Sequence, residues 1–231
     1  MKYYLVVVPF LLALLVIQSG SAAPGDIIWQ QTLGGPAGEE WGYSLDSYPD
    51  GGVVVTGIAY STDANVTGTH GNGDLWVVRL DSSGNQIWNR GYGGNESEYG
   101  LSVKSCPDGG SVIVGTTGSQ SGDVSGYHGN GDLWFLRLSG SGEILMQKVF
   151  GGNQTDEGGD ILQTTDGGYV MTGYTMSDDG DASGHHGGGD LWMIRLDQHG
   201  TMVWQKQMGG SRRASGSSII QTADGGFAMT G

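Results

Sequence analysis

The chain has 231 residues, 46 of them glycine and 5 proline, and its formal net charge is −14 at pH 7. It has no Gly-X-Y period, which excludes collagen, and its 7 Trp and 10 Tyr exclude a disordered chain. The acidic balance predicts no nucleic-acid partner, and a single cysteine excludes both an internal disulfide and a Cys-based zinc site.

Residues 1–23 have the pattern of a secretory signal peptide. Lys2 supplies the positive charge, residues 5–17 are apolar, and residues 18–23 are mostly small. As a helix, the apolar stretch would span roughly 20 Å, which is short of the ~30 Å hydrocarbon core of a membrane. We expect cleavage after Ala22 or Ala23. The mature protein is then secreted or attached to the cell surface, with no transmembrane segment.

Three short motifs recur at a common interval of 58 residues. The first is Asp-Gly-Gly, which begins at Asp50, Asp108, Asp166 and Asp224. The second is Gly-Asp-Leu-Trp, which begins at Gly73, Gly131 and Gly189. Gly-Gly pairs follow the same interval, with one extra residue in the first copy. Several motifs that share one period indicate a repeat protein.

Each repeat contains four β-like runs separated by turn residues. In the third copy the runs cover 160–164, 169–174, 191–196 and 202–208. Four strands in about 58 residues predict one blade of a β-propeller, so we expect an all-β fold of four-stranded antiparallel blades. A parallel β-helix is the alternative, but its coils are usually much shorter.

The repeats divide the mature chain, residues 24–231, into about 3.6 blades. We expect an N-terminal strand at 26–33, blades at about 42–92, 100–151 and 158–209, and a partial blade at 216–231. The third strand of the last blade is missing, so we expect an incomplete ring. Such a ring would close through further C-terminal blades or through association.

The turn before the fourth run carries the pattern L-D-x-x-G-x-x-x-W. It begins at Leu80 and Leu196, while the middle copy has Ser139 and Met146 in place of Asp and Trp. This pattern resembles the tryptophan-docking motif of quinoprotein-like propellers, and the whole repeat is similar to units of secreted bacterial and archaeal β-propeller proteins. The resemblance implies that each indole packs on the neighbouring blade. It leaves activity open, because propellers host many functions.

Successive connections in an antiparallel blade alternate between its two ends. The tight Asp-Gly-Gly and Asp-x-x-Gly turns therefore share one face, and the long glycine-rich loops share the other with the Gly-Gly-Asn corners. We call the second face the long-loop face. Binding is predicted there, because long loops on a rigid scaffold commonly carry function.

The long loops fit the pattern of a calcium-binding loop, D-x-[DN]-x-[DNST]-G-x5-[DE]. Calcium needs oxygen ligands at alternating positions, a glycine turn and a closing carboxylate. The candidate ligands are Asp63, Asn65, Thr67 and Asp74 in the first copy, Asp123, Ser125 and Asp132 in the second, and Asp179, Asp181, Ser183 and Asp190 in the third. The third copy fits best. The alternative is that these acids cap turns and accept hydrogen bonds from backbone amides.

Other polar residues recur in every repeat, which favours an architectural role for them. A His precedes each loop carboxylate, at His70, His128 and His186, and is predicted to bond the loop. An Arg in each third run, at Arg79, Arg137 and Arg195, is predicted to pair with acids or stack on aromatic rings. An acid before the first run, at Glu40, Glu98 and Asp156, could form a partial ring of carboxylates. Cys106 aligns with Thr164 and is predicted to be a small strand-end residue.

These patterns favour a non-enzymatic binding or structural module whose ligand is a protein or a glycan, with calcium as a stabilising cation. The alternative is a propeller enzyme, either a quinoprotein-like dehydrogenase or a carbohydrate-active hydrolase. Vicinal cysteines, which many quinoprotein dehydrogenases carry, are absent from the sequence. No residue is predicted to be catalytic, because we find no break in the repeat symmetry among these acids.

Overall fold

The computed structural model describes residues 2–8, 11–17, 27–34, 39–61 and 66–231. Within these residues every regular element is a β-strand. They include no helix long and apolar enough to cross a membrane. The predicted all-β class is therefore confirmed.

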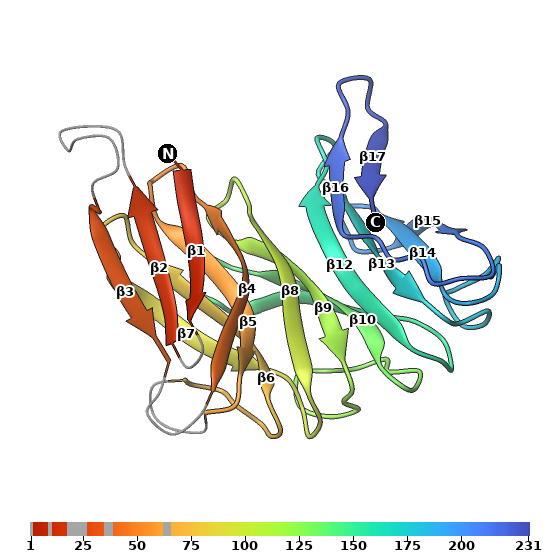
Figure 1. Cartoon of the computed structure of the whole chain (residues 1–231), viewed down its shortest axis with the longest axis horizontal. Coiled ribbons are helices and arrows are strands. Elements are labelled where there is room, and N and C mark those ends of the chain that lie inside the picture. The colour runs from red at the N-terminus through yellow and green to blue at the C-terminus, as the bar shows by residue number, and fades with distance from the viewer. Residues whose placement is uncertain (1, 9–10, 18–26, 35–38, 62–65) are drawn as a thin grey trace.

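Three four-stranded antiparallel sheets follow one another along the chain (Figure 1). Sheet I consists of β4 (Glu40–Ser47), β5 (Val53–Ala59), β6 (Asp74–Leu80) and β7 (Gln86–Tyr92). Sheet II consists of β8 (Glu98–Ser105), β9 (Ser111–Thr117), β10 (Asp132–Leu138) and β11 (Ile144–Phe150). Sheet III consists of β12 (Asp156–Gln163), β13 (Tyr169–Thr175), β14 (Asp190–Leu196) and β15 (Met202–Met208). Their bounds agree with the predicted blades to within two residues.

A two-stranded sheet, β16 (Ser218–Gln221) and β17 (Phe227–Thr230), follows sheet III. It coincides with the predicted partial blade. Each four-stranded sheet is ordered as its strands occur in the chain, and neighbouring sheets lie side by side in Figure 1. This arrangement is consistent with blades of a propeller-like fold, and the described strands form no closed ring.

The N-terminal part of the chain forms a three-stranded antiparallel sheet. Its strands are β1 (Lys2–Val8), β2 (Leu11–Ile17) and β3 (Trp29–Leu33), and β2 lies in the middle. β3 corresponds to the predicted strand at 26–33. β1 and β2 fall within the predicted signal peptide, while residue 1, residues 9–10 and the expected cleavage site lie outside the described residues. Cleavage stays a prediction.

Local turn chemistry explains the regular strand spacing. At the first Asp-Gly-Gly turn, the Tyr48 amide donates to Gly52 O (2.9 Å) and the Gly52 amide donates to Asp50 Oδ1 (2.8 Å). Gly51 has φ +84°, a conformation that glycine adopts without steric cost. The same turn recurs at Asp108 and Asp166, so each repeat reverses direction at the same place.

The hydrophobic core lies between neighbouring sheets. One cluster joins Val77 of sheet I to Ile113 and Leu136 of sheet II, and another joins Phe135 of sheet II to Met171 of sheet III. The third strands β6 and β10 are buried along their whole length. Adjacent repeats therefore stabilise one another by removing apolar area from water.

The indole rings of Trp29 on β3 and Trp88 on β7 each contact the sheet that follows in the chain. Trp29 packs against Gly84, and its Nε1 donates to Ser82 O (3.2 Å). Trp88 packs against Gly142, and its Nε1 donates to Gly140 O (2.9 Å). This is the contact that the resemblance to docking motifs implies.

Candidate functional site

The recurring arginines are bound inside the framework. Arg79 Nη2 lies 3.0 Å from Asp50 Oδ2, and its guanidinium carbon lies 3.6 Å from the ring centre of Tyr48. Arg137 and Arg195 make equivalent pairs with Asp108 (2.5 Å) and Asp166 (2.6 Å). The prediction that these arginines pair with acids or stack on aromatic rings is confirmed, and they hold the tight turns to the third strands.

Each recurring His bonds to the carboxylate four residues later. The backbone amides of His70, His128 and His186 donate to Oδ2 of Asp74 (2.8 Å), Asp132 (2.5 Å) and Asp190 (2.8 Å), respectively. All three carboxylates are fully buried. The other oxygen, Oδ1, of each has no hydrogen-bond partner in the described part of the chain. Burial raises the pKa of Asp132 to about 6 and also raises the pKa of Asp74.

Two of these buried carboxylates face a second acid from the next sheet. Asp74 Oδ1 and Glu98 Oε2 both lie close to the Cα atom of Gly93. A side chain in place of this glycine would overlap both oxygens. Gly151 has the same relation to Asp132 Oδ1 and Asp156 Oδ2. Burial raises the pKa of both Glu98 and Asp156. The junction of sheets I and II and the junction of sheets II and III therefore each contain a buried carboxyl pair.

The second acid of each pair, Glu98 or Asp156, also accepts hydrogen bonds from its own sheet and from the corner before it. Glu98 Oε1 accepts from Thr117 Oγ1 (2.9 Å), and Glu98 Oε2 accepts from the Gly94 amide (2.9 Å). Asp156 makes the equivalent bonds to Thr175 and to the Gly152 amide. Both side chains are fully buried. These bonds place the acids inside the sheet junctions, where they tie a strand start to a loop corner.

The third junction differs from the other two. Asp190 Oδ1 lies against Gly209, but the position equivalent to Glu98 and Asp156 is Ala214. Two imidazoles lie beside Asp190 instead. The Nδ1 atoms of His186 and His185 lie 2.9 Å and 3.7 Å from Asp190 Oδ2.

Three of the predicted calcium ligands, Asp123, Asp179 and Asp181, accept hydrogen bonds from the corner that precedes their loop. Asp123 Oδ2 accepts from the Gly93 amide (3.2 Å). Asp181 Oδ2 accepts from the Gly151 amide (3.4 Å), and Asp179 Oδ1 accepts from the Asn153 amide (2.9 Å). These are the backbone-bonding contacts of the alternative prediction.

The hydroxyl ligands are also engaged elsewhere. Ser183 Oγ accepts from Gln205 Nε2 (2.6 Å), Ser125 Oγ accepts from Gln147, and Thr67 Oγ1 donates to Asn89 O (2.7 Å). Asp63 and Asn65 lie outside the described residues. In the part of the chain that is described, no group of three His, Cys, Asp or Glu side chains is placed to hold a metal ion. Calcium binding stays a prediction from the sequence.

Cys106 follows β8 and is buried, with 2% of its surface exposed. Burial raises the pKa of its thiol to about 11, so the thiolate is disfavoured at neutral pH. Its place agrees with the predicted strand-end role.

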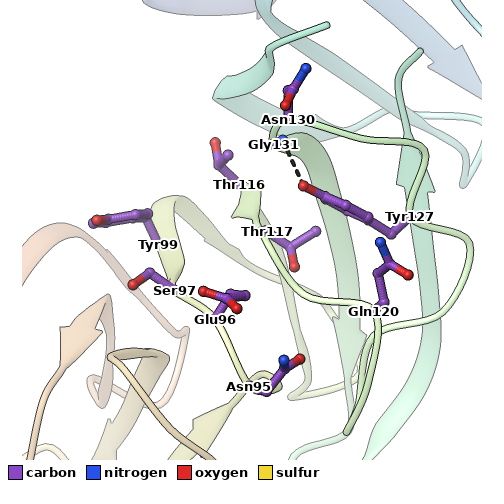
Figure 2. A pocket seen from close by; sticks show the side chains of 11 residues that line it. Asn95, Glu96, Ser97, Tyr99, Thr116, Thr117, Gln120, Tyr127, Asn130 and Gly131 are labelled. Carbon is purple, nitrogen blue, oxygen red and sulfur yellow. Dashed lines mark hydrogen bonds between the residues drawn. The ribbon is translucent and has the colours of Figure 1, made fainter. Parts of the chain in front are cut away.

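A cavity of about 630 Å³ opens on the long-loop face of sheet II. Its walls come from the corner after β7, the start of β8, the end of β9 and the long loop before β10. The lining residues are Asn95, Glu96, Ser97, Tyr99, Thr116, Thr117, Gly118, Gln120, Tyr127, Asn130 and Gly131. Figure 2 shows Tyr99 and Tyr127 at two sides of this cavity, with Glu96 and Thr117 between them. The Gly131 amide donates to Tyr127 Oη (2.9 Å), which holds that ring against the loop.

Exposed aromatic rings of sheet I lie next to Tyr99 in the cavity wall: Tyr43 and Tyr60 interact with Tyr99, and Trp41 is on β4, two residues before Tyr43. Trp41, Tyr43 and Tyr60 are 49%, 39% and 42% exposed, and they are the exposed aromatic side chains of the described residues. Burial raises the pKa of Tyr60 to about 12, and a hydrogen bond with Tyr99 contributes. The pKa of Tyr43 is raised by burial and by the neighbouring Tyr99. We call Trp41, Tyr43, Tyr60 and Tyr99 the aromatic platform.

Sequence reasoning missed the aromatic platform, although a signal was present. Aligned at the repeat interval, Trp41 and Tyr99 correspond to Glu157 and Ser215. The aromatic character is therefore confined to the first two repeats. The break in repeat symmetry lies at aromatic positions and not among the recurring acids.

A second cavity, of about 650 Å³, opens on the opposite face beside the tight turns. Lys104, Arg137 and Thr164 contribute to its lining. Arg137 is held there by Asp108, so part of this cavity belongs to the Arg–Asp framework.

No protein-family model matches the chain, and no curated protein matches it. A solved structure of a protein of unknown function from Bacteroides caccae is similar at a TM-score of 0.49 and 12% identity, over 87% of this chain and 55% of that one. A variant of the Synechocystis apocarotenoid oxygenase is similar at a TM-score of 0.45 and 13% identity, over 99% of this chain and 57% of that one. The chain spans little more than half the length of these proteins. Likenesses at this level carry no conclusion about this chain.

Proposed function

We propose that this chain is a secreted or cell-surface β-propeller that acts as a non-enzymatic binding module and takes its ligand on the long-loop face. The observation that carries the proposal is the cavity of about 630 Å³ on that face, whose wall residue Tyr99 interacts with the exposed rings of Tyr43 and Tyr60. Concave sites with aromatic walls and a few polar groups are common ligand sites.

The roles of the repeated charged residues support a binding rather than a catalytic function. Arg79, Asp74 and Glu98, like their counterparts in the other repeats, are buried and bonded to neighbouring turns, corners or loops. These groups hold the sheets together. The cavity is lined instead by amides, hydroxyls, two tyrosine rings and one carboxylate.

The proposal includes the closure of the ring of blades. We propose that copies of this chain associate to complete the ring, and light scattering of the purified chain measures this association.

The experiment compares binding with turnover in the purified full chain. The chain is screened on glycan and protein arrays, and hydrogen exchange is measured with and without the best ligand. We expect saturable binding and slower exchange at 95–97 and 118–131, with the tight turns unchanged. In parallel, the chain is incubated with pyrroloquinoline quinone in a dye-reduction assay and with polysaccharides in a reducing-sugar assay. Turnover in either assay, or slower exchange confined to the tight-turn face, would refute the proposal.

A further inference from the structure

We infer that the aromatic platform and the amide-lined cavity beside it together form a binding site for a neutral oligosaccharide. The inference rests on the proposed binding function and names the ligand class for that site. It stands on three observations: the exposure of the rings, the polar chemistry of the lining, and the confinement of the rings to the first two repeats.

The exposure of the platform is unusual for this chain. The indoles of Trp76, Trp134 and Trp192 are fully buried, whereas Trp41 is 49% exposed. The remaining exposed apolar side chains are aliphatic or methionine. Leaving aromatic area in water forgoes about 25 cal/mol per Å² of possible burial. A cluster of such rings beside a cavity is therefore typical of a binding surface. Flat rings of this kind stack on the C–H faces of pyranose sugars.

The cavity offers hydrogen-bonding groups of the kind that sugar hydroxyls need. A hydroxyl both donates and accepts, and so does an amide side chain. Asn95 Oδ1 accepts from Ser121 Oγ (2.7 Å), which leaves its Nδ2 able to donate. Asn130 Nδ2 donates to Asn153 O (3.0 Å), which leaves its Oδ1 able to accept. Gln120 adds a third amide, which is exposed.

The charge of the lining disfavours an anionic ligand. Glu96 is the ionisable acid in the lining, and none of the lining residues is Lys, Arg or His. The whole chain carries a formal charge of −14. Acidic sugars and phosphates would meet repulsion without a cationic partner, whereas a neutral oligosaccharide meets none.

The aromatic residues of this site are not conserved between the repeats of the chain. Tyr60 corresponds to Gly118 and Met176, and Tyr127 corresponds to Thr69 and His185. Residues that recur in every sheet are explained by the framework. These rings do not recur, so the framework does not require them.

Sheet III supplies a matched control position. Glu157 takes the place of Trp41 and Tyr99 there, and its carboxylate pairs with Arg213 at the surface (3.3 Å). Changing Glu157 therefore perturbs the equivalent strand position without touching the aromatic platform.

The test measures binding of four defined hexasaccharides to the full chain by isothermal titration calorimetry. Cellohexaose, xylohexaose and chitohexaose are neutral, and hexagalacturonate is acidic. We expect saturable binding of at least one neutral hexasaccharide and none of hexagalacturonate. Trp41→Ala and Tyr99→Ala are each expected to weaken binding about tenfold or more, with the melting temperature retained. Tyr127→Phe keeps the ring and checks whether its hydroxyl is needed, and Glu157→Ala is expected to bind like the parent chain.

Three results would overturn the inference. The first is that no neutral hexasaccharide binds. The second is that binding is unchanged in both Trp41→Ala and Tyr99→Ala while these variants remain folded. The third is that a proline-rich hexapeptide binds at the platform in place of all the sugars. In the first and third cases, slower hydrogen exchange at 95–97 and 118–131 with another array ligand would leave the proposed binding function standing.

Discussion

Asn in place of Asp132 is expected to make the protein more stable at pH 7.5 and to leave its stability unchanged near pH 4. Asp132 lies fully buried against Asp156, and burial raises the pKa of Asp132 from 3.8 to about 6. His128 Nδ1, 3.2 Å from Asp132 Oδ2, lowers this pKa, so the raised value already includes its attraction. A pKa that is higher in the folded state means that the folded state binds a proton more tightly than the unfolded state.

The sign and size of the effect follow from proton linkage. This contribution to stability is fully present below the unfolded pKa of 3.8 and is lost as pH rises through about 6. A shift of about two pKa units corresponds to about 3 kcal/mol. The amide of Asp132→Asn is neutral at every pH, whereas the carboxyl of Asp132 is neutral only in acid. The variant should therefore gain up to about 3 kcal/mol relative to the parent chain between pH 4 and pH 7.5.

Urea denaturation followed by tryptophan fluorescence measures this difference at pH 4, 5, 6 and 7.5, with EDTA present to remove cations. Asp190→Asn is the matched control, because Ala214 replaces the partner acid at that junction. The control is expected to gain less than Asp132→Asn at pH 7.5, because Asp190 is also buried but faces two imidazoles and no partner acid. If the parent chain and Asp132→Asn follow parallel profiles across this range, Asp132 does not carry the raised pKa and the reasoning is wrong.

Three further predictions concern the indole of Trp88, the third long loop and the N-terminus. Trp88→Ala is expected to cost about 2 kcal/mol in urea denaturation, because the indole loses its packing on Gly142 and its hydrogen bond to the next sheet. The neighbouring exposed Ile87→Ala should cost little, and equal costs would contradict the docking role. Calcium is expected to raise the melting temperature of the parent chain and not that of a variant with both Asp179→Ala and Asp181→Ala. An equal rise in both proteins would exclude the third loop as the calcium site. N-terminal sequencing of the chain from a secreting host should begin at residue 23 or 24, and a product that still begins at residue 1 would refute the signal peptide.

The strand layout was predictable because its causes are local. Asp50 and Gly51 fold one turn through contacts within five residues, and the same motif returns every 58 residues. Once the turns are placed, the β-branched and aromatic runs between them have little freedom except to form strands. The contact of Trp88 with the next sheet was expected only from the resemblance to docking motifs and not from the repeat itself.

The sites were less predictable because their residues come from different repeats. The sequence pattern grouped Asp123 with Asp132, which is nine positions later in the same loop. The structure places Asp123 against Gly93 and His70 of the preceding repeat instead. Asp74 and Glu98 likewise meet only because sheet I packs against sheet II.

The amino-acid sequence by itself determined the all-β class, the repeat length, the strand bounds and the residues that make each turn. These depend on hydrogen bonds and backbone conformations within one repeat. Only the tertiary structure decided which carboxylates are paired, which arginines are bound inside, and where exposed rings gather beside a cavity. Those features depend on how neighbouring sheets pack, and one period along the chain does not encode which atoms meet across a junction.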